Sequence, residues 1–151
     1  MDNAEWVRLS SQLRSVVLTD RRLPEPVFQP GYEDFHFMEF DTTIVGKFWL
    51  TLQRLMRRSG DEHCSLVVLD PHPVKHFFSD FGSYGALRLD IGNTTNDYYD
   101  ALSAEPDGSP ADALLYNSEA IVWVPDSLDW AIWGERSLGV AIVVRFWLRL
   151  A

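Results

Sequence analysis

The sequence lacks several features that would place it in a membrane or outside the cell. Of its 151 residues only Cys64 is a cysteine, so no disulfide can form within the chain. The longest uninterrupted hydrophobic runs, such as Val140 to Val144, are far too short to cross a bilayer. Acidic residues, Asp2 and Glu5, stand near the start, where a secretory signal needs basic residues. We therefore expect a cytoplasmic protein that does not enter a membrane.

The middle of the chain also lacks positive charge. No Lys, Arg or His occurs between Arg88 and Arg136, although the chain has 13 basic and 22 acidic residues and a net charge of −9. The acids of this interval are Asp90, Asp97, Asp100, Glu105, Asp107, Asp112, Glu119, Asp126, Asp129 and Glu135. An acidic field repels nucleic-acid phosphates and attracts cationic proteins. We expect a cationic protein partner and no nucleic acid; a solvated acidic face without any partner is the alternative.

The composition is that of one folded domain. Hydrophobic residues make up 46% of the chain and charged residues 23%, and neither a repeat nor a linker divides residues 1–151. Apolar spacing predicts helices starting at Asp2 or Asn3 and at Thr42 or Thr43, and further helices over Val74–Phe81 and Asn96–Ser103. Strands are predicted over Phe35–Phe40, Ser65–Leu69, Ala86–Ile91, Ala120–Val124, Trp130–Trp133 and Leu138–Phe146.

These elements predict an α+β fold. We expect a mostly antiparallel sheet of four to six strands, with helices packed mainly on one face. The last two strands read as a hairpin. Because the final strand is apolar on both faces, it should lie inside the sheet rather than at its edge.

Few residues suggest catalysis. Asp70, His72 and His76 form the most metal-like cluster, although Pro73 places His72 before a helix rather than on it. A small enzyme or a metal- or ligand-binding domain centred on these residues is the alternative hypothesis. His63 precedes Cys64, but neighbours in an extended segment point to opposite sides, so a thiol nucleophile is not expected. We predict no enzyme activity, no cofactor and no metal.

Aromatic residues within the acidic interval suggest a binding face instead. Tyrosine and tryptophan are frequent in the energetic centres of protein interfaces, and surrounding acids would form a negative rim. The acids would steer a partner and the tyrosines would anchor it. The predicted partner-binding residues are Asp97, Tyr98, Asp100, Asp107, Asp112 and Tyr116.

The C-terminal hairpin resembles a known family. Trp130 to Ala141 reads WAIWGERSLGVA and is similar to the closing segment of small bacterial immunity proteins, which accompany polymorphic toxins, including contact-dependent inhibition toxins. The resemblance implies a cytosolic, non-catalytic inhibitor that blocks a cognate toxin, often a nuclease with a basic cleft. It implies no binding role for Glu135 or Arg136, which could pair locally or shape the turn. A general acidic adaptor without a toxin remains an alternative, and the oligomeric state stays open.

Overall fold

The computed structural model describes residues 1–104 and 118–146. Six strands in these ranges form one sheet. The strands run β1-β6-β5-β4-β2-β3 across the sheet, and every neighbouring pair is antiparallel. Their bounds are β1 Tyr32–Glu39, β2 His63–Asp70, β3 Ala86–Asp90, β4 Ala120–Pro125, β5 Trp130–Glu135 and β6 Val140–Phe146. The predicted α+β class with an antiparallel sheet is confirmed.

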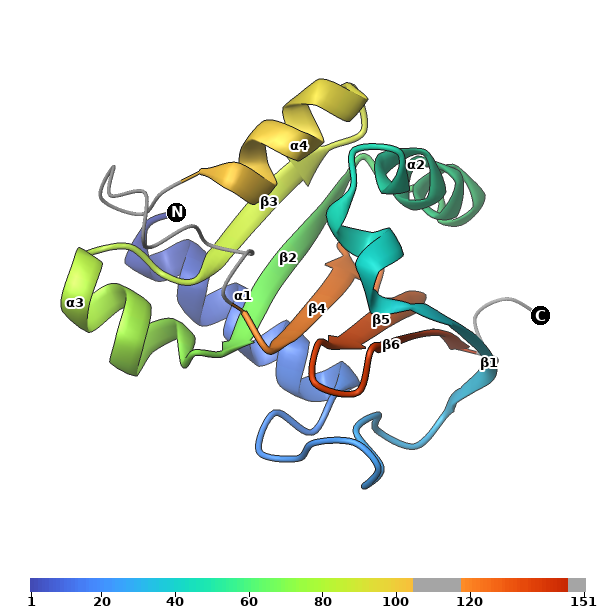
Figure 1. Ribbon diagram of the computed structural model, residues 1–151, viewed down its shortest axis with the longest axis horizontal. Helices are drawn as coiled ribbons and strands as arrows, with labels where there is room; N and C mark the ends of the chain where they lie inside the picture. The colour runs from blue at the N-terminus through green and yellow to red at the C-terminus, as the bar shows by residue number, and fades with distance from the viewer. Residues whose placement is uncertain (105–117, 147–151) are drawn as a thin grey trace.

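Helices cover the sheet on both faces (Figure 1). Helix α1 (Asn3–Val16) packs Trp6, Leu9 and Leu13 against one face. Helices α2 (Phe48–Ser59) and α4 (Thr95–Ser103) pack against the other, where most helical residues of the larger core lie. Every residue of β4 and β5 is buried, because side chains of both faces enter a core.

Capping residues fix the helix ends. Asp2 caps α1: its side chain accepts a hydrogen bond from the Glu5 amide at 2.8 Å, and the Asp2 amide donates one to the Glu5 carboxylate. The expected helix start at Thr42 or Thr43 is wrong. Both residues lie in a 3₁₀ turn, η1 (Phe40–Ile44), in which the Thr43 hydroxyl donates to a backbone carbonyl, and α2 begins only at Phe48.

The next helical segment is short. A helical turn, η2 (Pro73–Phe78), runs into α3 (Ser79–Phe81), and the chain leaves it at Gly82 with φ 73°. Glycine suits this left-handed position because it has no Cβ to clash. Within the described ranges, no helix is long and apolar enough to cross a membrane.

The C-terminal hairpin sets the order of the last strands. Strands β5 and β6 pair with Glu135 opposite Val140, and β6 lies between β5 and β1. The predicted interior position of the last strand is therefore confirmed. As a consequence, β1 forms one edge of the sheet and β3 the other.

Candidate functional site

The acids between Leu89 and Glu135 do not form one face where the structure describes them. Glu119 and Asp126 lie just beyond opposite ends of β4, which places them about 20 Å apart at the rise of a strand. Glu135 is buried, with 4% of its surface exposed. Asp126 binds the Arg88 guanidinium through both carboxylate oxygens, at 3.0 and 2.7 Å. The described acids of this interval therefore do not form the single acidic face that the sequence suggested. Several of them make contacts within the protein instead.

The position of Tyr98 on helix α4 contradicts its predicted role as an exposed anchor. Tyr98 is fully buried, its hydroxyl donates to the Thr43 carbonyl at 2.8 Å, and its ring stacks on Trp49 at 5.7 Å. Burial raises the pKa of Tyr98 above its ordinary value. The prediction that Tyr98 is an exposed anchor is wrong, because Tyr98 and Leu102 stand four residues apart and share the helix face turned to the core.

The other predicted binding residues have different positions. The Asp97 carboxylate accepts a hydrogen bond from the Thr94 amide at 2.8 Å and so helps to cap α4. Asp100 is exposed on the same helix. Asp107, Asp112 and Tyr116 lie outside the described residues. Asp97 and Asp100 are thus the acids of the predicted set that are seen at the surface.

The residues of the alternative, metal-like hypothesis serve local structure. His72 Nδ1 accepts hydrogen bonds from the amides of Val74 and Lys75, at 3.1 and 3.0 Å, and so caps the turn that follows. Partial burial and then the Lys75 charge lower the pKa of His72. His76 Nδ1 lies 3.5 Å from the Asp80 carboxylate. Over residues 1–104 and 118–146, no three His, Cys, Asp or Glu side chains are grouped to hold a metal.

Cys64 lies in the core among residues of β2 and its neighbours. It is fully buried, and burial raises its pKa to about 12, so the reactive thiolate is disfavoured at neutral pH. The ring of the adjacent His63 lies against Asp90, with 3.1 Å between Nε2 and Oδ2.

Glu135 and Arg136 of the hairpin motif make hydrogen bonds to segments far away in the sequence. The buried Glu135 carboxylate accepts hydrogen bonds from the Leu23 amide at 2.7 Å and from Trp133 Nε1 at 3.1 Å. Arg136 Nε donates to the Ser118 carbonyl at 2.8 Å, and its guanidinium lies over the Phe40 ring. The two side chains thus join a loop near the N-terminus and the start of β4 to the hairpin.

A surface that the sequence did not reveal lies on β1. Phe37 is 70% exposed and Phe35 is 52% exposed, and only β6 pairs with this edge strand within the described chain. Alternation along a strand puts Phe35, Phe37 and Glu39 on the same side. Among the described elements, no helix covers Phe35 and Phe37, so two large aromatic side chains remain at the surface.

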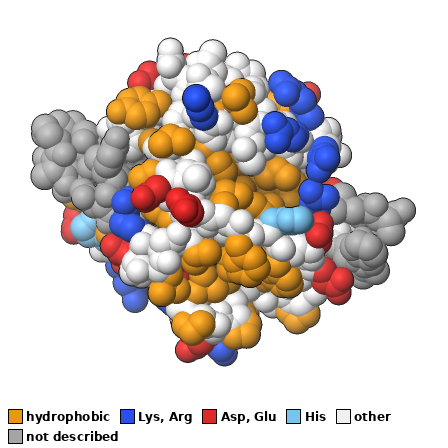
Figure 2. All heavy atoms as spheres, turned by 45° about the vertical axis from the view of Figure 1, so that its right-hand side comes forward, with side chains coloured by type: hydrophobic (Ala, Val, Ile, Leu, Met, Phe, Trp, Pro, Cys, Tyr) orange, Lys and Arg blue, Asp and Glu red, His pale blue; other side chains and the backbone are white. Residues whose placement is uncertain are grey.

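Acids flank the two phenylalanines. Glu33, Glu39 and Asp41 are exposed, and across the described ranges their carboxylates have neither a hydrogen-bond partner nor an ionic one. Asp34 is different, because it lies 3.1 Å from His36 Nε2 and 3.7 Å from Arg145 Nε. Figure 2 shows hydrophobic side chains gathered on the side of the molecule that carries α2 and β1, with acidic and basic groups around them.

The local sequence predicts the strand β1 but not the exposure of its aromatic side chains. Residues 32–39 read YEDFHFME, and within them Phe35, His36 and Phe37 alternate between aromatic and polar, which favours the strand expected over Phe35–Phe40. A bulge between Glu33 and His36, where Asp34 has φ 59°, shifts the register of the strand against β6. The alternation was visible in the sequence, but the position of the strand at the sheet edge was not.

No protein-family model, curated protein or solved structure matches the chain.

Proposed function

We propose that the protein is a non-catalytic immunity protein that binds a cognate bacterial toxin domain and covers its active site. The docking surface is the exposed side of β1 that carries Phe35, Phe37 and Glu39, together with Asp41 just after the strand. The observation that carries the proposal is the pair of exposed phenylalanines on an edge strand beside unpaired carboxylates. The C-terminal hairpin that resembles immunity proteins supplies the class of partner.

The exposed phenylalanines support binding because folding leaves at least half of each side chain in contact with water. Burial of a whole Phe side chain is worth about 1.5–3 kcal/mol, and Phe37 forgoes most of that gain at 70% exposure. A partner that covers both rings would recover it. As far as the structure describes the chain, the outer edge of β1 pairs with no strand and also offers backbone N–H and C=O groups to a partner segment.

The charge of this surface supports a basic partner. The unpaired carboxylates of Glu39 and Asp41 accompany two apolar rings, which is typical of a desolvated anchor with a polar rim. Such acids accelerate the approach of a cationic surface and disfavour acidic competitors. A nuclease-type toxin has a basic cleft for phosphates, so this surface suits it better than it suits nucleic acid itself.

The test begins with the gene immediately upstream, which should encode a large protein with a C-terminal toxin domain. That purified domain should form a complex with the protein, and co-expression should protect cells from it. Phe37→Ala should weaken the complex by about 30-fold or more, the loss typical of an interface hot spot. Tyr99→Ala is the matched control, because Tyr99 is an exposed aromatic at 47% on α4, away from β1.

Other outcomes would overturn the proposal. An upstream gene without a toxin domain, or a toxin domain that does not bind, would leave a general acidic adaptor as the better description. Equal affinities for Phe37→Ala and Tyr99→Ala would remove β1 as the docking surface. Hydrolytic or metal-dependent activity that is lost in His76→Ala would support the alternative hypothesis centred on Asp70, His72 and His76.

A further inference from the structure

The outer face of α2 has the opposite charge from β1. The helix has no acidic residue, although the chain has 22 acids and 13 bases. Its exposed cations are Arg54, Arg57 and Arg58. Within the described chain none of the three guanidinium groups has an ionic or hydrogen-bond partner. We call these three arginines, together with Leu50 and Gln53, the arginine face.

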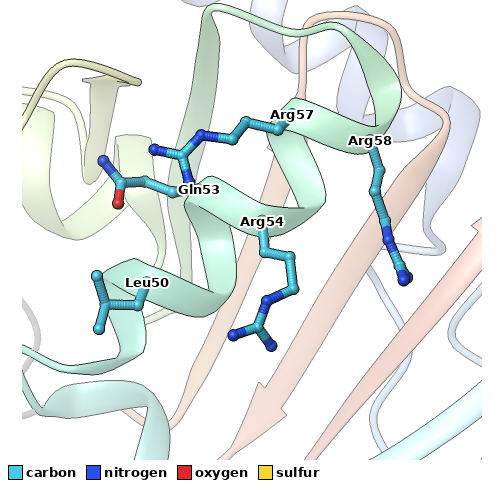
Figure 3. A pocket seen from close by; sticks show the side chains of 5 residues that line it. All are labelled: Leu50, Gln53, Arg54, Arg57 and Arg58. Atoms are coloured by element: carbon cyan, nitrogen blue, oxygen red, sulfur yellow. The ribbon is translucent and has the colours of Figure 1, made fainter.

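The helix period arranges these side chains in two rows. Leu50, Arg54 and Arg58 follow one another at intervals of four residues, and Arg57 follows Gln53 at the same interval. In Figure 3 Arg54 and Arg58 extend to one side of the helix, whereas Arg57 extends toward Gln53. Together the five residues line an open hollow of about 430 Å³.

Part of this face is rigid and part is apolar. Gln53 Nε2 donates to the carbonyls of Ile91 and Asn93, at 2.9 and 3.3 Å, so its amide is held in place beside the arginines. Leu50 is 52% exposed next to Arg54. A fixed polar side chain, an exposed apolar side chain and three free cations therefore lie within one hollow.

The needs of the helix explain only part of this arrangement. Cations in the last turn interact favourably with the helix dipole, worth about 0.3–1 kcal/mol each, which accounts for Arg57 and Arg58. Arg54 lies before the last turn and four residues from Arg58, a spacing at which like charges repel. Leu50 at the surface also contributes little to folding. The stability of the helix therefore explains neither Arg54 nor the exposed Leu50.

We propose that the arginine face binds an acidic segment of a partner protein, with carboxylates on Arg54 and Arg58 and an apolar side chain on Leu50. Arginine pairs with a carboxylate through two parallel hydrogen bonds, which gives such a contact both energy and direction. A protein segment suits this face better than nucleic acid does, because a net charge of −9 repels an extended phosphate backbone but only weakly opposes a few carboxylates. The inference is independent of the docking surface on β1.

The experiment selects ligands without assuming their identity. A random-peptide display library is panned on the immobilised wild-type protein after depletion on the Arg54→Gln/Arg58→Gln variant. Enriched peptides should be rich in Asp and Glu and should contain an apolar residue. In fluorescence anisotropy, the double variant should weaken their binding by about tenfold or more, since two charge-assisted contacts are lost.

The controls separate this face from general electrostatics. Arg8→Gln/Arg14→Gln removes the same charge from exposed positions of α1 and should leave affinity within about twofold. Leu50→Ala should weaken binding without changing its salt dependence. No enrichment over the double variant, enriched peptides without acids, or equal losses in the α1 control would overturn the inference. Tighter binding of a single-stranded oligonucleotide through the same arginines would replace the protein segment with nucleic acid.

Discussion

Replacement of Glu135 tests whether the hairpin motif acts through structure. The Glu135 carboxylate is buried and accepts hydrogen bonds from the Leu23 amide and from Trp133 Nε1. A hydrogen bond to a charged group is worth about 1.5–3 kcal/mol, so the two bonds together contribute about 3–6 kcal/mol before the cost of burying the carboxylate. Because Glu135→Ala also removes that cost, we expect the free energy of unfolding to fall by about 2–3 kcal/mol.

Urea denaturation measures this loss, and two further variants interpret it. Glu135→Gln keeps an acceptor oxygen but has no charge, so its free energy of unfolding should fall by only about 1 kcal/mol. Glu119→Ala removes an exposed carboxylate nearby and should stay within about 0.5 kcal/mol of the wild type. Amide exchange at Leu23 should accelerate in Glu135→Ala, since its acceptor is gone. If Glu135→Ala lost no more stability than Glu119→Ala, the conclusion that Glu135 connects the loop at Leu23 to β5 would be refuted.

Further predictions concern the core and the exposed rings. Cys64 should stay unreactive toward a thiol reagent at about pH 8 until the protein unfolds, because burial raises its pKa to about 12. Its contribution to stability is complete below the ordinary thiol pKa of 9.0 and should decline as the pH rises from there toward 12, which unfolding at several pH values would show. Tyr98→Phe should lose about 1 kcal/mol in thermal unfolding by removing the bond to Thr43, whereas the exposed Tyr99→Phe should lose none. Phe37→Ala should cost less than about 1 kcal/mol of stability, so a large loss of toxin binding in it cannot come from unfolding.

The sequence predicted the elements better than it predicted the site. The apolar periodicity of α1, the hairpin and the two-sided final strand all led to correct elements, because local spacing alone decides which side of an element is apolar. The start of α2 was missed, because a side-chain hydrogen bond of Thr43 favours a 3₁₀ turn that periodicity does not reveal. The prediction that Tyr98 lies at the surface was also wrong, because local spacing does not show which tyrosine faces the core. Either tyrosine of the pair could face inward, and only the packing of α4 against α2 selected Tyr98.

By itself the sequence determined the fold class, the net charge and the apolar faces of the helices. These depend on composition and on periods of two and 3.6 residues, both of which are local properties. The tertiary structure alone decided which groups meet water. The order of the strands placed β1 at an edge and left Phe35 and Phe37 exposed, and long-range contacts gave Asp126 and Glu135 their partners. Exposure and charge pairing depend on segments far apart in the chain, so a sequence read locally can list an acid or a ring but cannot show whether it is free to bind.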